Sequence, residues 1–212
     1  MDENVLWHDN ELINIAAKSL KKNNFEVLTA KNSEEAKNKI LEIIGKNEIV
    51  AFGGSQTVKQ INIVEALSQR GQKLILQKSG MKQDEVIELR RKALNADVFI
   101  ASPNALTLEG SLFFVDRIGN RTSGAVFGPR KVILIAGVNK IVEDDIAALN
   151  RVKTKAGPMN SKRLALATPC AKTGLCSDCD SAERICNIYL KIRKKPSYTD
   201  YYIVLIPEEL GY

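Results

Sequence analysis

Four cysteines near the end of the chain are the residues best suited to chemistry, and the sequence contains no others. Their spacing is C-x5-C-x2-C-x6-C, formed by Cys170, Cys176, Cys179 and Cys186. Four thiolates satisfy a tetrahedral zinc ion or an iron–sulfur cluster, and soft sulfur ligands suit both. We therefore expect a metal centre here, an iron–sulfur cluster (4Fe–4S as the first choice) or zinc. The spacing matches neither a zinc ribbon nor a bacterial ferredoxin, so it leaves the metal open.

Two other states of the cysteines are compatible with the sequence. Reduced structural thiols are one, and disulfides or redox-active pairs are the other. Disulfides are typical of small secreted domains, whereas residues 1–10 are polar and lack the apolar stretch of a signal peptide. A chain of 212 residues buries enough surface to fold without cross-links. We therefore favour the metal, and we do not expect the fold to depend on it.

Composition excludes several classes of function. No apolar run approaches the roughly 20 residues that cross a bilayer, so we expect a soluble cytoplasmic protein. The net charge of +6 is spread along the chain, and aromatic residues make up only 6% and do not alternate with the cations. This pattern argues against nucleic-acid binding. His8 is the single histidine and lies in the polar beginning of the chain, so no Ser-His-Asp or Cys-His machinery is expected.

A glycine turn follows an apolar run at residues 48–52. Its candidate ligand-binding residues are Gly53, Gly54, Ser55 and Thr57. Glycines let a ligand approach the backbone, and the start of a following helix offers free N–H groups to an anion. The turn is neither a Walker loop nor a dinucleotide fingerprint. A plain turn in which Ser55 caps the helix is the alternative.

A second group of candidates lies between residues 102 and 140, each near the carboxyl end of an expected strand. The group contains Asn104, Glu109, Gly110, Asp116, Asn120, Arg121, Asn139 and Lys140. Ligands of open α/β sheets bind at that edge. Arg121 is the best residue to bind a carboxylate with two hydrogen bonds, and Lys140 adds charge. Glu109 and Asp116 are the candidates for acid–base or nucleophilic catalysis, although Glu109 is also typical of a solvated turn.

Helices and strands must alternate to position these groups. Periodicity predicts helices at residues 11–20, 32–44, 57–69 and 83–94, and strands at 25–28, 48–52, 73–77 and 97–101. Such alternation predicts an α/β fold, a mostly parallel sheet covered by helices on both faces.

The second half is predicted with less regular elements. We expect strands at 111–116 and 131–136 joined by a long binding loop rather than a helix, then helices at 143–153 and from Pro158 to 166. A cysteine loop at 168–187 precedes strands at 187–192 and 201–206. No repeat or boundary divides the chain, so residues 1–212 are expected to form one domain, with residues 1–10 as an N-terminal arm.

The motifs together resemble the LUD domain family, the lactate-utilisation proteins of the LutC/YkgG type. The resemblance rests on Gly53-Gly54-Ser55 with Thr57, Ser102 with Asn104-Ala105, Gly119-Asn120-Arg121, Gly128-Pro129, Asn139-Lys140 and the cysteine segment of the short branch. It implies a fold similar to that of ribose-5-phosphate isomerase and the CoA transferases, with the glycine turn facing a phosphate or CoA. It also implies a role beside iron–sulfur partner proteins that oxidise L-lactate to pyruvate.

Three functions are compatible with the sequence. The first is an accessory or electron-transfer component of the lactate-oxidising system, with a small carboxylate as ligand. The second is an isomerase- or transferase-like enzyme for a phosphorylated or CoA-linked molecule, because Glu109-Gly110 looks like the carboxylate-glycine turn of the CoA transferases. The third is a non-catalytic module with structural zinc.

Overall fold

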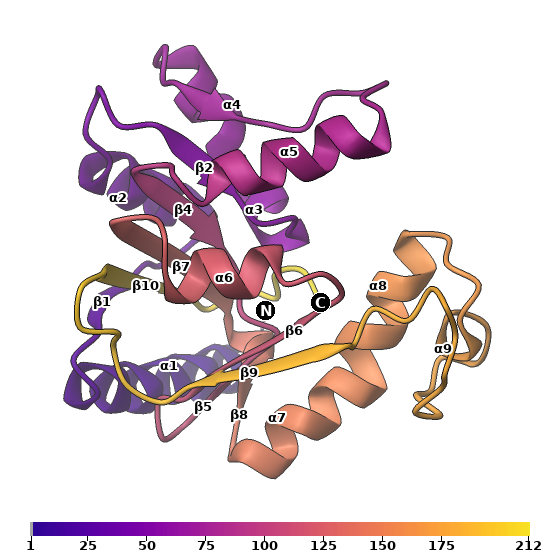
Figure 1. The fold of residues 1–212 in the computed structure, drawn as a ribbon. Helices are drawn as coiled ribbons and strands as arrows, with labels where there is room; N and C mark the ends of the chain where they lie inside the picture. The colour runs from indigo at the N-terminus through magenta and orange to yellow at the C-terminus, as the bar shows by residue number, and fades with distance from the viewer. Residues whose placement is uncertain (1) are drawn as a thin grey trace.

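A six-stranded parallel sheet lies at the centre of the computed structural model, which describes residues 2–212 (Figure 1). Each strand pairs in parallel with its neighbours. In spatial order the strands are β1 (Glu26–Thr29), β10 (Asp200–Ile206), β7 (Lys131–Gly137), β4 (Val98–Ala101), β2 (Val50–Phe52) and β3 (Leu74–Ile75).

Both faces of this sheet are covered, which explains why its central strands are apolar throughout. Successive side chains of β4 alternate between two cores: Val98 and Ile100 face one, Phe99 and Ala101 the other. On the first face lie α2 (Ser33–Ile43), α3 (Gln56–Gln60) and α4 (Ile63–Gln69). On the second lie α1 (Glu3–Lys22), α5 (Gln83–Ala93) and α6 (Asn120–Val126). The predicted fold class is confirmed.

A second, four-stranded sheet was not expected. Its order is β8 (Ile141–Val142), β5 (Ala105–Thr107), β6 (Leu112–Asp116) and β9 (Ile188–Ile192). β5 and β6 form an antiparallel hairpin, and β9 joins it from far along the chain. The strands predicted at 111–116 and 187–192 therefore exist, but in this sheet rather than the central one.

One long helical stretch carries the chain away from the central sheet (Figure 1). It consists of α7 (Asp145–Arg151), a π-helical turn η2 (Val152–Ala156) and α8 (Gly157–Arg163), without interruption. Two separate helices were predicted, the second opened by Pro158. Pro158 instead lies at the start of α8 within the continuous stretch, just after the π turn. The cysteine segment follows and begins with the short helix α9 (Pro169–Thr173).

Three further predictions are corrected by the structure. The expected arm at residues 1–10 is helical from Glu3, because Asp2 caps α1 through its carboxylate. The expected long loop after β6 contains α6. The helix expected at 57–69 is divided at Asn62, which has a left-handed φ of 56°. No helix within residues 2–212 has the length and apolarity needed to cross a membrane.

Candidate functional site

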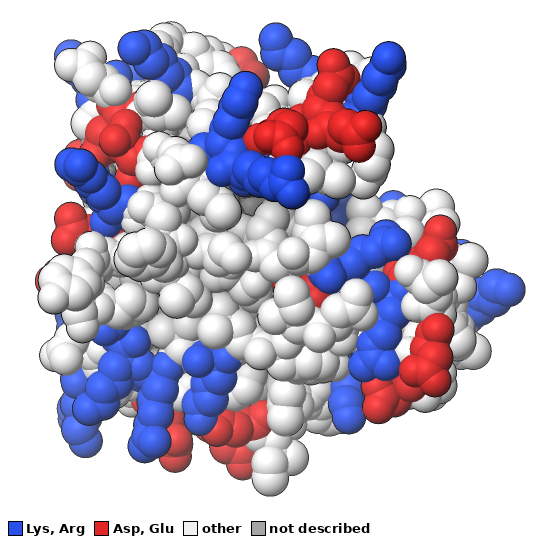
Figure 2. Space-filling view, viewed as in Figure 1, with Lys and Arg blue, Asp and Glu red and all other residues white. Residues whose placement is uncertain are grey.

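A cleft of about 540 Å³ lies between α5, the segment from β6 to α6, and the helical stretch η2–α8. Arginines dominate its charge: Arg90 comes from α5, Arg117 and Arg121 from the β6–α6 segment, and Arg163 from α8. Blue side chains flank this hollow on both sides in Figure 2. Asp116 is the one acidic side chain among the residues that line the cleft.

The carboxylate of Asp116 is already occupied by backbone donors. Its Oδ1 accepts from the N–H of Arg117 at 2.9 Å, and its Oδ2 accepts from those of Arg121 and Thr122 at 2.8 and 3.2 Å. The N–H groups of Arg121 and Thr122 are free groups in the first turn of α6, so Asp116 caps this helix from outside that turn. Its single negative charge offsets one of the four arginines that line the cleft.

Arg121 is held in place by neutral acceptors. Its guanidinium donates to Asn104 Oδ1 at 3.0 Å and to the carbonyl of Val115 at 2.7 Å. Gly53 leaves the space that its side chain occupies, because a Cβ there would lie 3.1 Å from Arg121 Cγ. Burial lowers the pKa of Arg121, although Asp116 opposes this shift. The group remains a cation at neutral pH, because the guanidinium of arginine keeps its proton in proteins.

Two more basic side chains are buried behind Asn104. Lys140 is 3% exposed and donates to Ser102 Oγ at 2.8 Å and the carbonyl of Pro103 at 3.2 Å. Arg151 is 7% exposed and donates to the carbonyls of Asn139 and Asn104. Burial, together with the charges of Arg151 and Arg121, holds the pKa of Lys140 well below its usual 10.5, and burial lowers the pKa of Arg151 to about 10. Their hydrogen-bond partners are all neutral.

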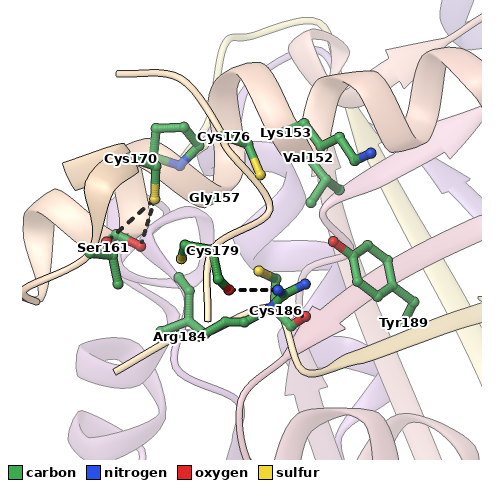
Figure 3. Close-up of a pocket in the computed structure, with 13 residues that line it drawn as sticks. Val152, Lys153, Gly157, Ser161, Cys170, Cys176, Cys179, Arg184, Cys186 and Tyr189 are labelled. Carbon is green, nitrogen blue, oxygen red and sulfur yellow. Dashed lines mark hydrogen bonds between the residues drawn. The ribbon is translucent and has the colours of Figure 1, made fainter. Parts of the chain in front are cut away.

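The four cysteines line one small cavity next to the cleft. Figure 3 shows their sulfur atoms around a single space below the helix that carries Val152 and Gly157. Arg184 orders the loop by donating to the carbonyl of Cys179 at 2.7 Å and to Asp178 at 2.7 Å. Burial raises the pKa of the Cys186 thiol, an effect that the nearby Arg184 opposes.

The four thiols of this cavity are chemically suited to bind a metal, but their side chains are not arranged to do so. Within residues 2–212 no three His, Cys, Asp or Glu side chains are arranged so that they could hold a metal ion. Cys170 turns toward Ser161 and donates to its hydroxyl at 3.6 Å. The cavity volume is about 20 Å³, close to that of one water molecule. All four cysteines are unpaired and partly buried. A metal bound here therefore requires rotation of cysteine side chains, and a cluster requires the loop to open.

The two cavities share a wall. Val152, Gly157, Ile185 and Cys186 line both of them. Cys186 is thus the one cysteine that lines the cleft as well as the cysteine cavity. The first residue of the π turn, Val152, is part of this wall. The turn is followed directly by Gly157, and the wall is thin at that point because glycine has no side chain.

The structure brings only part of the predicted set into the cleft. Gly54, Asn104, Asp116, Asn120 and Arg121 line it, together with Cys186. Three other predicted residues, Thr57, Ser55 and Asn139, are engaged elsewhere. Thr57 Oγ1 donates to the carbonyl of Leu210, and Asn139 Oδ1 accepts from the N–H of Leu210, so both fix the C-terminal segment. Ser55 caps α3 by accepting from the N–H of Val58 at 3.3 Å, as the simpler alternative proposed.

Glu109 and Gly110 lie at the tip of the β5–β6 hairpin. Their carbonyls accept from the Asn23 side chain at 2.9 and 3.2 Å, next to the end of α1. Gly110 has a φ of 81°, and a Cβ there would lie 2.9 Å from the backbone of Leu20. Glu109 is exposed and lines neither cavity. Lys140 also lines neither, because it is buried behind the cleft.

Sequence reasoning missed Arg90, Arg117 and Arg163. None belongs to a local motif, and α5 and α8 carry several other basic residues that point to solvent. Arg117 follows Asp116 directly, which is the one local signal that marks it. Arg90 and Arg163 are far apart in sequence and meet only because α8 faces α5 across the cleft.

Comparisons with known proteins agree with this architecture. The family model described as LUD domain matches residues 13–206. A solved structure of a DUF162 family protein from Deinococcus radiodurans is similar to the chain, with 10% identity, a TM-score of 0.54, and coverage of 93% of this chain and 98% of that one. At this identity the likeness concerns the fold alone. A structure of eIF2B delta from Chaetomium thermophilum has 15% identity, coverage of 54% and 49%, and a TM-score of 0.31, too low to support an argument. No curated protein sequence matches the chain significantly.

Proposed function

The chain belongs to the LUD domain family, and on this premise we propose that it is an accessory or electron-transfer component of an iron–sulfur system that oxidises L-lactate to pyruvate. One observation supports the proposal above the others: the four cysteines line one cavity, and that cavity shares Cys186 with a cationic cleft. The proposal places the chain with the LutC/YkgG type of the family. Its partners are iron–sulfur proteins that accept the two electrons released when lactate becomes pyruvate.

In this proposal the residues of the two cavities divide the work. Cys170, Cys176, Cys179 and Cys186 hold the metal centre, which when bound supplies one-electron transfer. Arg184 keeps the backbone of the cysteine loop in place. On the other side of the shared wall, Arg121 pairs with an anionic group, and its hydrogen bonds to Asn104 and Val115 fix the direction in which it points.

Metal and sulfide analysis tests this function. Protein purified without oxygen from iron-replete cells should be brown and contain iron with acid-labile sulfide. Cys179→Ser should lose most of that iron, whereas Ser177→Ala in the same turn should retain it. Colourless, iron-free wild-type protein from such a preparation would contradict the proposal.

A structural zinc is a second candidate, and the small volume of the cysteine cavity favours it. One zinc ion per chain, with no iron or sulfide in the same anaerobic preparation, would support this module over the cluster. In that case the cysteine loop stabilises the end of β9 and carries no electrons.

An enzyme of the isomerase or transferase class, acting on a phosphorylated or CoA-linked molecule, is the third candidate. The volume of the cleft and its four arginines favour it. Glu109 does not line the cleft, which leaves Asp116 as the predicted acid that does. A thermal-shift screen with sugar phosphates, CoA thioesters and L-lactate tests it. A stabilising shift with L-lactate alone would count against this enzyme class.

A further inference from the structure

We propose that the cleft and the cysteine cavity form one two-chambered site, in which the cleft binds a ligand with at least two negative charges and this ligand covers Cys186. The inference extends the proposed function. It rests on that function only where it assigns a role to the cysteines. It stands on the charge balance of the cleft and on the wall that the two cavities share.

The charge balance calls for more than one anionic group. Arg90, Arg117 and Arg163 reach the cleft from three different elements, and Arg121 lies at its base. A single carboxylate pairs well with one or two guanidinium groups and leaves the others without a counter-charge. Asp116 offsets one of these four positive charges, which leaves the lining of the cleft with an excess of three.

A buried cation behind the cleft increases this demand. Arg151 is almost completely buried, and its hydrogen-bond partners are the neutral carbonyl oxygens of Asn139 and Asn104. Charges removed from water are normally paired, and their field is weakly screened in the interior. The charge of Arg151 therefore adds to the positive potential of the cleft, which is lined by its hydrogen-bond partner Asn104 and its chain neighbour Val152.

The shared wall places such a ligand against one cysteine. Cys186 lines the cleft as well as the cysteine cavity, whereas Cys170, Cys176 and Cys179 line only the latter. Gly157 forms part of the same wall without a side chain. A ligand that fills the cleft therefore excludes solvent from the cleft side of Cys186 and leaves the other three thiols as they were.

Binding of inorganic pyrophosphate to the full chain as isolated tests the charge argument. Calorimetry should detect binding, and L-lactate should bind at least about tenfold more weakly, because it presents one charge to the same arginines. Arg163→Gln and Arg90→Gln should each weaken pyrophosphate about tenfold or more. Their matched controls are the exposed neighbours Lys162→Gln and Arg91→Gln, which do not line the cleft and should bind as the wild type does.

Thiol labelling of the reduced, chelator-treated full chain tests the shared wall. Iodoacetamide modification of each cysteine is followed by peptide mass spectrometry. Pyrophosphate at about ten times its dissociation constant should slow the labelling of Cys186 about tenfold, because only about one site in eleven is then empty. Cys170 should be labelled at an unchanged rate. Arg163→Gln should require proportionally more pyrophosphate for the same protection.

Three outcomes would overturn the inference. One is L-lactate binding without pyrophosphate binding, which would leave the proposed function intact. Another is pyrophosphate binding that leaves Cys186 labelling unchanged. The third is equal protection of all four cysteines, because that result indicates a general tightening of the chain. Iron and sulfide content is independent of each of these results, so a failure of the cluster proposal is recognised separately.

Discussion

Asp116 illustrates how the partners of a charged residue decide its role. The sequence places it among candidate catalytic acids, and the structure gives its carboxylate three backbone donors, two of them in the first turn of α6. One of these donors is the N–H of Arg121, the residue whose side chain lies at the base of the cleft. Asp116 is therefore best understood as a positioning residue that acts on the cleft through α6.

Replacement of Asp116 should reduce the stability of the chain. Asp116→Ala leaves the first N–H groups of α6 without acceptors, and we expect a loss of about 1–3 kcal/mol in the free energy of unfolding. Asp116→Asn keeps one acceptor oxygen and should lose less. Urea denaturation measures both. An Asp116→Ala protein as stable as the wild type would contradict this positioning role.

Lys140 should make stability depend on pH. Its pKa in the folded chain lies well below 10.5 because of burial and the charges of Arg151 and Arg121. Between the folded and unfolded pKa values the unfolded chain binds more protons, so the free energy of unfolding contributed by Lys140 rises with pH. The stability of the wild type relative to Lys140→Met should therefore increase from pH 7 toward pH 10, by at most about 1.4 kcal/mol per pH unit.

Urea denaturation at several pH values measures this difference. Lys155→Met, at an exposed position of the π turn, is the control and should stay parallel to the wild type at every pH. A Lys140→Met profile that also stays parallel to the wild type would mean that Lys140 keeps an ordinary pKa in the folded chain.

Residue types indicated which side chains gather near the cleft better than they indicated the hydrogen bonds that each side chain makes. Asn104 and Arg121 were expected at the edge of the sheet and do line the cleft. Thr57 and Asn139 have the same character but bond to Leu210, more than seventy positions away from either of them. Nothing local in the sequence indicates that the last residues fold back over the glycine turn, so their role was not predictable.

At the scale of elements, the π turn between α7 and α8 matters most to the site. It provides one end of the wall between the two cavities and places Gly157 directly after it. Helical periodicity indicated helices on both sides of this turn. It could not indicate a wider turn between them, because the extra residue per turn is imposed by packing.

Gly157→Ala should destabilise the chain although alanine favours helices. A Cβ at this position would lie 2.9 Å from the carbonyl oxygen of Val152, and backbone at this distance must shift. Overpacking costs about 1–3 kcal/mol, and the better helix propensity returns about 1 kcal/mol, so we expect a net loss of about 1 kcal/mol. Thermal and urea unfolding measure it. Lys155→Ala is the matched control and should leave the free energy of unfolding almost unchanged. A gain in stability for Gly157→Ala would show that the π turn relaxes without cost.

At the scale of the whole molecule, the central sheet was predictable and the small sheet was not. Strands β2 and β4 are recognisable in the sequence as apolar runs between helices, because both of their faces are buried. β9 pairs with β6 across some seventy residues of chain, and its exposed side chains show no clear alternation. Pairing over such a distance depends on the packing of everything between the partners, which a local pattern does not contain.

The separation of the cores from the cysteine segment leads to a last prediction, on metal removal. Neither large hydrophobic cluster includes any residue between 157 and 187, and the four cysteines lie outside both. The cores alone should therefore fold the chain, as its length allows. Chelator-treated protein should keep its far-ultraviolet circular dichroism and unfold in one cooperative transition. Trypsin should cut it faster than the metal-bound form at Lys172 and Arg184, and at unchanged rates elsewhere. Loss of the cooperative transition would mean that the metal holds the fold together, and with it the cleft.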